Sequence, residues 1–275
     1  MRKVSGWIGA LCTLFLLATS FSMAASAAGY DTKKTEAIKG TPTIDGKMDD
    51  IWKKANKIDV NQLNKDLIPS DSTTTAEAYT MWDDTNFYFL AIVKDSHVSD
   101  KGGTTGPEDV DSIEIQIDEK NSKGKGNVAT GNAAAGCFRV DANGKTTGFG
   151  AKFDKDSAKF KGAAVKTDTG YIVEAAVPFS AIKPAEGTTI AMEVQINDNM
   201  ADKGRAGLIA WNSNKVLGWQ DTEAMGEVKL VAAAGGNAGT DNPKTGEAMP
   251  VAGAALLTLS AAVTGGCIVS ARKKK

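Results

Sequence analysis

The chain has 275 residues, of which 24% are charged, and its formal net charge at pH 7 is −1. A chain of this length accommodates one domain with further segments at its ends. Its single histidine, His97, excludes a multi-His or Cys/His zinc cluster and any catalytic arrangement that needs a second histidine. His97 lies in the polar stretch KDSHVSD, where we expect it to be exposed to solvent.

The first 27 residues have the composition of a secretory signal peptide. Arg2 and Lys3 precede an apolar run at residues 8–17, and Ala25-Ser26-Ala27 supplies the small residues of a cleavage site. The apolar run is too short for a stable membrane span, which needs roughly 20 apolar residues. We therefore predict that residues 1–27 are removed and that the remainder is secreted.

Between the two ends, the hydrophobic pattern predicts strands rather than long helices. One short exception, residues 49–56 (DDIWKKAN), fits two helical turns with Trp52 facing inward. Alternation of apolar and polar residues, broken by Gly, Asp and Asn, predicts strands at 76–83, 86–95, 111–118, 137–141, 170–179, 189–198 and 226–231. This density of strands indicates an all-β fold, an antiparallel β-sandwich of jelly-roll-like type.

Alternation also sorts the side chains of three of these strands into two faces. The apolar residues point to the core, whereas Glu114, Arg139, Gln195 and Asn197 point to the opposite side of the sheet. One interpretation is an ordinary solvated face, since antiparallel sheets often have one. The combination of amides, an arginine and a carboxylate favours instead a surface that binds a neutral, hydroxyl-rich ligand.

The tryptophans divide into two groups. Trp52, Trp82 and Trp211 lie among apolar residues, and we expect all three in the core. Trp219 follows Gly218 in a polar loop between predicted strands, where packing gives little reason for an indole. We therefore predict a binding role for Trp219.

The C-terminal region combines a tether with an anchor. Residues 232–241 are mostly the small residues Ala and Gly, and this composition predicts a flexible tether. Asn242-Pro243-Lys244-Thr245-Gly246 resembles the sorting pentapeptide of Gram-positive surface proteins, with Asn in place of the commoner Leu. An uncharged apolar run at 248–271 and a basic tail follow it, in the order typical of such signals.

The resemblance implies that residues 242–275 form a sorting signal. A sortase would cleave between Thr245 and Gly246 and join the chain to cell wall peptidoglycan. The alternative is a plain transmembrane anchor that holds an extracellular domain. Either way, we expect the domain at the surface of a Gram-positive bacterium.

Removing both ends changes the charge of the chain. Six of the 32 basic residues and one of the 33 acidic residues are lost, which leaves a net charge of −6 and a single cysteine, Cys137. An acidic surface disfavours nucleic acid and anionic lipid as partners. One cysteine excludes an internal disulfide, so we expect the core, with or without metal ions, to hold the domain together.

An ordered set of segments between residues 34 and 231 resembles carbohydrate-binding module family 9, a type associated with xylanases. The segments are TPTIDGKMDDIW (41–52), AYTMWDDTNFYFLAIVKD (78–95), DSIEIQIDEKN (111–121), CFRV (137–140), GYIVEAAVPF (170–179), VQIND (194–198) and LGWQDTEAMGEVKL (217–230). The resemblance implies a non-catalytic β-sandwich that grips the reducing end of a glycan, such as a cellulose or xylan oligosaccharide, between two parallel Trp rings.

Carried over by position, the family's polar binding residues fall on Glu114, Arg139, Gln195 and Asn197, and its second clamp Trp falls on Trp219. The first clamp Trp is absent, because Glu108 occupies that position. The resemblance also implies structural calcium, for which Asp95 and Asp111 are candidate ligands. The alternative is that these two acids only cap turns.

These features predict a secreted, wall-attached module that binds plant-type β-glycan, as polysaccharide or oligosaccharide, without catalysis. A surface glycosidase is a less favoured alternative, because it needs two suitably placed carboxylates on a domain that resembles a binder. The second alternative, favoured by Glu108, is an adhesion or interaction protein that has kept the scaffold and lost the sugar site.

Overall fold

The computed structural model describes residues 32–233, apart from residues 100, 103–105, 124–127, 129–130, 214 and 216. The predicted signal peptide (1–27), nearly all of the predicted tether (232–241) and the predicted sorting signal (242–275, with Thr245, Gly246 and the apolar run 248–271) lie outside these residues. Within the described part, no helix has both the length and the apolar character needed to cross a membrane.

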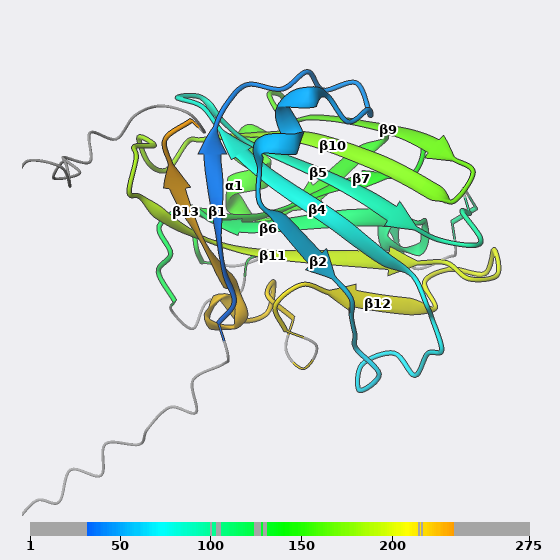
Figure 1. The fold of residues 1–275 in the computed structure, drawn as a ribbon. Helices are drawn as coiled ribbons and strands as arrows, with labels where there is room; N and C mark the ends of the chain where they lie inside the picture. Colours follow the sequence, from blue (N-terminus) through cyan, green and yellow to red (C-terminus); the bar gives the residue numbers. More distant parts are fainter. Residues whose placement is uncertain are drawn as a thin grey trace, which may run out of the picture. The chain divides into compact units, whose positions relative to one another are not determined.

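The described residues form thirteen strands and four short helices (Figure 1). The strands are β1 (Lys34–Lys39), β2 (Lys57–Val60), β3 (Gln62–Leu63), β4 (Thr75–Trp82), β5 (Asn86–Lys94), β6 (Ser112–Asp118), β7 (Ala135–Asp141), β8 (Thr146–Phe149), β9 (Lys161–Thr167), β10 (Gly170–Pro178), β11 (Thr189–Asp198), β12 (Gly207–Ala210) and β13 (Gly226–Val231). The helices are α1 (Ala151–Asp156) and the 3₁₀ turns η1 (Asp50–Lys54), η2 (Pro107–Asp109) and η3 (Thr222–Ala224).

The strands lie in two layers that β1 connects. One layer runs in the order β8-β7-β6-β11-β13 and the other in the order β4-β5-β10-β9. Figure 1 shows β4, β5 and β10 stacked over β6, β7 and β11. The predicted all-β sandwich is confirmed, with one departure from antiparallel pairing: β1 pairs in parallel with both β13 and β4.

All seven predicted strands are present, with ends within about two residues of those expected. The sequence pattern revealed these strands because each strand buries one row of side chains between the layers. Ile113, Ile115 and Ile117 of β6 are an example. Of the strands that the pattern missed, β2, β3, β8 and β12 have two to four residues. β1 has six and is paired on both sides, but its two buried residues, Ala37 and Ile38, are adjacent and do not alternate. β9 forms one end of the strand order and is largely exposed or half-buried, so it has no strong apolar row.

The outer face of the β4-β5-β10 layer is covered by the segment that contains Trp52. The predicted helical turns are found as η1, and Trp52 is fully buried, as expected. Its Nε1 donates to Oε1 of Glu174 at 2.8 Å, and the other carboxylate oxygen of Glu174 accepts the backbone N–H groups of Asp45 and Gly46. Trp82 and Trp211 are also buried, which confirms their assignment to the core.

Candidate functional site

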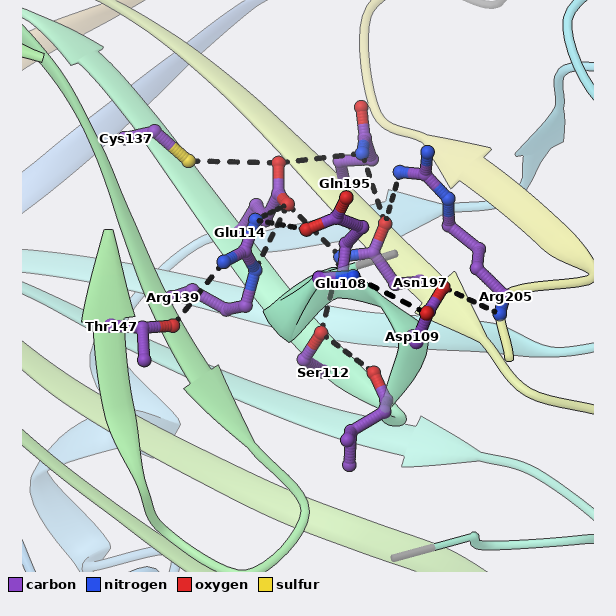
Figure 2. Close-up of polar contacts among 12 residues, drawn as sticks. Glu108, Asp109, Ser112, Glu114, Cys137, Arg139, Thr147, Gln195, Asn197 and Arg205 are labelled. Atoms are coloured by element: carbon purple, nitrogen blue, oxygen red, sulfur yellow. Dashed lines mark hydrogen bonds and ion pairs between the residues drawn. The ribbon is translucent and has the colours of Figure 1, made fainter. Parts of the chain in front are cut away.

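A row of polar side chains crosses the outer side of the β7-β6-β11 layer. Gln195 of β11 pairs in register with Glu114 of β6, and Glu114 pairs with Arg139 of β7. Asn197 lies two residues further along β11, on the same face and opposite Ser112. The structure therefore brings together the four polar residues that strand alternation placed on one face (Figure 2).

Glu114 is the centre of this group, and both of its carboxylate oxygens are fully engaged. Oε1 accepts hydrogen bonds from Nε and Nη2 of Arg139 and from Nδ2 of Asn197. Oε2 accepts from the side-chain amides of Gln116 and Gln195 and from the thiol of Cys137. Six donors on two oxygens exceed the roughly four lone-pair sites of a carboxylate. Glu114 thus orients its neighbours and has no acceptor capacity left for a ligand.

Electrostatics keep Glu114 ionised. Burial alone would raise its pKa, but the charge and hydrogen bonds of Arg139, with those of Asn197 and Gln116, outweigh burial and hold the pKa below its ordinary value. Burial likewise opposes the charge of Arg139, and the neighbouring Glu114 reverses this and raises the pKa of the guanidinium. Both partners of the ion pair are therefore charged at neutral pH.

The polar row is buried, contrary to the expectation of an open sheet face. Glu114 is 2% exposed and Arg139 is 5% exposed, while Gln195 and Asn197 are also buried. The turn that follows β11 covers part of the row: Nη1 of Arg205, eight residues after Asn197, donates to Oδ1 of Asn197 at 3.0 Å. What remains is a pocket of about 370 Å³ whose lining includes parts of Glu114, Arg139 and Gln195.

Trp219 lines this pocket from a loop that hydrogen bonds fix at its start and at Trp219 itself. Its carbonyl accepts the N–H of Val128 at 2.7 Å. At the start of the loop, the buried carboxylate of Glu193 accepts the backbone N–H groups of Trp211, Asn212 and Ser213. Burial raises the pKa of Glu193 to about 7 even though these hydrogen bonds favour its charged form.

Gly218 allows the loop to approach the sheet closely. A Cβ at this position would lie 2.7 Å from Oε1 of Gln116 and 2.8 Å from Cβ of Glu193. Any larger residue would therefore lift the neighbouring Trp219 away from the polar row. The Gly-Trp pair noted in the sequence thus has a steric reason.

The aromatic part of the pocket consists of Trp219 and Phe149. Both are half-buried, with ring centroids 6.1 Å apart and planes at 86°. An edge-to-face contact of this kind is a favourable geometry for aromatic rings. Phe149 holds the indole in place from the side, so the pair does not form two parallel walls.

Glu108, which stands where the family's first clamp Trp would lie, also lines the pocket from η2. Its side chain is 29% exposed, and Nη2 of Arg139 lies 3.9 Å from Oε2. Within the described residues, no hydrogen bond to this carboxylate is seen. Figure 2 shows Glu108 over Arg139 and Glu114.

Two pocket residues were missed by sequence reasoning. Phe149 lies on β8, a four-residue strand that the pattern did not reveal, although its register opposite Cys137 follows from the β7–β8 hairpin. Arg205 lies in the turn between β11 and β12, and no local signal marks it. The hairpin formed by these two strands brings it to Asn197, eight residues earlier.

A second candidate site is a cluster of three buried carboxylates. Asp95, Asp111 and Asp198 each place an oxygen within 4.8 Å of the others. The sequence singled out Asp95 and Asp111. Asp198 was missed. Because Asn197 pairs with Ser112, the next residue of β11, Asp198, comes opposite Asp111. His97 is beside the cluster on the exposed side, as expected, with 47% of its side chain accessible.

The cluster has the donor set that a hard cation needs. Oδ2 of Asp95 and Oδ1 of Asp198 are buried without a hydrogen-bond partner. Burial raises the pKa of Asp111 to about 7, opposed by backbone hydrogen bonds and assisted by Asp95 and Asp198. Unpaired buried carboxylate oxygens are costly unless a cation compensates them, and calcium takes six to eight oxygen ligands. The residues therefore fit calcium.

The role of Glu114 generates a stability prediction. Glu114→Gln leaves Arg139 buried without its counter-ion and should lower the free energy of unfolding by about 3–5 kcal/mol at pH 7. Because the pKa of Glu114 is lowered by folding, its contribution is complete above pH 4.5 and fades as the pH falls through the lowered pKa. Urea denaturation at pH 7 and pH 3 measures both effects.

Glu108→Gln is the matched control, since Glu108 is partly exposed and 3.9 Å from the same guanidinium. Its cost should stay below about 1 kcal/mol. Equal stability of Glu114→Gln and wild type at pH 7 would show that the network does not hold the pocket floor.

Comparison with known proteins identifies the family to which this chain is similar. Residues 44–233 match the family described as "Carbohydrate family 9 binding domain-like". The chain is 36% identical over 200 residues to an exoglucanase, XynX, of Acetivibrio thermocellus, covering 73% of this chain and 17% of that protein. It is 34% identical over 220 residues to endo-1,4-beta-xylanase A of Thermotoga neapolitana, covering 78% of this chain and 20% of the xylanase. The chain thus spans about a fifth of the length of these relatives.

Two solved structures are also similar. Both are a carbohydrate-binding module of family 9 from Caldicellulosiruptor kristjanssonii, one in complex with cellotriose and one with glucose. The cellotriose complex has a TM-score of 0.64 and 27% identity, and the match covers 74% of this chain and 96% of that one. The glucose complex has a TM-score of 0.63 and 27% identity, with 75% and 100% covered. The family match covers most of the described residues, and the fold agrees with it. The chain therefore belongs to carbohydrate-binding module family 9.

Proposed function

We propose that the pocket beside Trp219 binds plant-type β-glycan, such as xylan, cellulose or their oligosaccharides, without catalysis. The observation that carries the proposal is a half-buried indole fixed at the edge of a preformed polar pocket. Aromatic rings stack on the apolar C–H face of a pyranose, and a few placed polar groups fix its orientation. Arg139, Gln195 and Asn197 would supply or position those groups.

The comparisons support this proposal. Related modules of known structure hold cellotriose and glucose, and the curated relatives are named as xylanases and an exoglucanase. The matched part of those enzymes corresponds to a binding family, so the resemblance extends to glycan recognition and not to hydrolysis.

The pocket chemistry also argues against a glycosidase. Hydrolysis needs one carboxyl group that protonates the leaving oxygen and a second that acts as nucleophile or base. Of the described residues that line the pocket, two carry a carboxylate, Glu108 and Glu114. Glu114 has its pKa lowered and both oxygens occupied, so it serves neither role.

We further propose that the protein is extracellular and attached to the cell wall. The sequence of the ends supports this: a secretory signal at 1–27 and a sorting signal at 242–275. At the surface the module would concentrate polysaccharide near other wall proteins. A sortase and the peptidoglycan would then be its processing partner and its attachment point.

The third proposal is structural calcium at Asp95, Asp111 and Asp198. Its support is the pair of unpartnered buried oxygens, together with the lone pairs that Asp111 keeps after accepting the backbone N–H groups of Ser99 and Asn199. When bound, the ion would supply positive charge to three otherwise uncompensated carboxylates. Asp111 directly precedes β6, so the ion would also fix the entry to the strand that carries Glu114.

The glycan proposal predicts that wild type is retained on insoluble xylan or cellulose and that Trp219→Ala is not. Loss of the indole, on which the sugar ring would stack, should weaken binding by about 1–3 kcal/mol. This range is that of aromatic side chains on which nucleic-acid bases stack. Leu67→Ala, which shortens an apolar side chain that is 48% exposed and outside the pocket, is the control and should bind as wild type does.

Each alternative gives a different result in the same pull-down. Failure of wild type to be retained on any polysaccharide would favour the adhesion protein. Release of reducing sugar from the polysaccharide would favour the glycosidase.

The calcium proposal predicts that adding calcium to chelator-treated protein raises its unfolding temperature. At about 100 times the dissociation constant, the ion should stabilise the fold by about 2–3 kcal/mol. Asp198→Asn should remove most of this gain, whereas Asp154→Asn, at an exposed site on α1, should keep it. Identical melting curves with calcium and with chelator would rule the ion out.

The attachment proposal predicts a defined new C-terminus. Wall material digested with a peptidoglycan hydrolase should yield the protein ending at Thr245 and joined to a wall peptide, as seen by mass spectrometry of its C-terminal fragment. Thr245→Ala, which alters only the cleavage position, should leave the protein extractable by detergent. Wild-type protein extracted by detergent and still ending at Lys275 would instead identify a plain membrane anchor.

A further inference from the structure

The pocket contains one carboxylate that is available to a ligand, and it is Glu108 rather than Glu114. Glu114 has six donors on its two oxygens. Among the described residues Glu108 has only an ion pair at 3.9 Å, and its side chain is 29% exposed into the pocket. An acceptor in this state favours a ligand group that donates a hydrogen bond to it.

The pocket is also aromatic on one side only. Trp219 and Phe149 lie together at 86°, whereas Glu108 adjoins Arg139. Arg205, whose Nη1 is bound to Asn197, contributes a second guanidinium to the lining. A sugar ring stacked on Trp219 would therefore meet charged groups rather than a second ring.

The shape of a pyranose decides which sugar suits such a pocket. In the β anomers of glucose and xylose every hydroxyl is equatorial, so both ring faces are apolar and fit between two aromatic walls. An apolar face pressed against Glu108 would strip water from a carboxylate and give it no hydrogen bond, which is unfavourable. Mannose and galactose each carry one axial hydroxyl, so one ring face is apolar and the other presents a donor.

We propose that Glu108 is a specificity-determining residue that shifts the pocket toward hexoses with one axial hydroxyl, in the manno or galacto configuration. The inference rests on the proposed glycan binding at Trp219 and names the sugar class for that site. The apolar face of the hexose stacks on the indole, and the axial hydroxyl on the other face donates to Glu108.

The test is calorimetric titration of the purified full-length chain with three disaccharides that differ only in configuration: cellobiose, β-1,4-mannobiose and β-1,4-galactobiose. Wild type should bind mannobiose or galactobiose about tenfold more tightly than cellobiose, as expected for one hydrogen bond to a charged acceptor. Glu108→Ala should reduce this ratio to about one, and Glu108→Trp should reverse it in favour of cellobiose. Glu186→Gln, which removes an exposed carboxylate outside the pocket, should retain the wild-type ratio.

The outcomes distinguish the inference about Glu108 from the proposal of glycan binding. If wild type binds cellobiose at least as tightly as both other sugars, or if Glu108→Ala leaves the ratio unchanged, the inference about Glu108 is wrong and glycan binding stands. If wild type and Glu108→Trp bind none of the three, both fail. Thermal unfolding of each variant, expected to match wild type because Glu108 lies at the pocket edge, excludes misfolding as the cause.

Discussion

The ion pair between Glu114 and Arg139 is the interaction on which the site depends. It is buried, it joins neighbouring strands, and it fixes the amides of Gln195 and Asn197 through the same carboxylate. Removing either charge would leave the other stranded away from water, so the group persists as a unit. The pocket floor is consequently rigid before any ligand arrives, and binding needs little ordering of side chains.

Buried carboxylates elsewhere hold loops in the same way. Glu193 clamps the backbone at residues 211–213, and Glu174 clamps residues 45–46. Glu119 accepts the N–H groups of residues 180–182 and pairs with the buried Lys152, which also reaches Asp156. The described residues contain no disulfide, so these hydrogen bonds stabilise the loops as disulfide bonds do in many secreted domains.

The sequence predicted the strands and the sides of the sheet well, but not the burial of the polar row. Period-two alternation is a local property, so Ile113, Ile115 and Ile117 revealed β6 and placed Glu114 on the opposite side. Covering that side depends on segments outside the strands, such as the turn after β11 that carries Arg205 and the loop that carries Trp219, and alternation within strands does not predict their conformation. Glu193 likewise lies on a strand with clear alternation, yet it is 2% exposed and accepts backbone N–H groups at the start of the loop that leads to Trp219. Alternation of apolar and polar residues within a strand does not predict tertiary contacts of this kind.

Glu108 occupies the middle of η2, and the turn is held by its neighbour. Asp109 is buried, its carbonyl accepts from Asn199, and its carboxylate accepts the backbone N–H of Arg205. The proposed role of position 108 in recognition is therefore separate from its small contribution to folding. A substitution there needs no compensating change elsewhere, so related modules can differ in the sugar they select while sharing one scaffold.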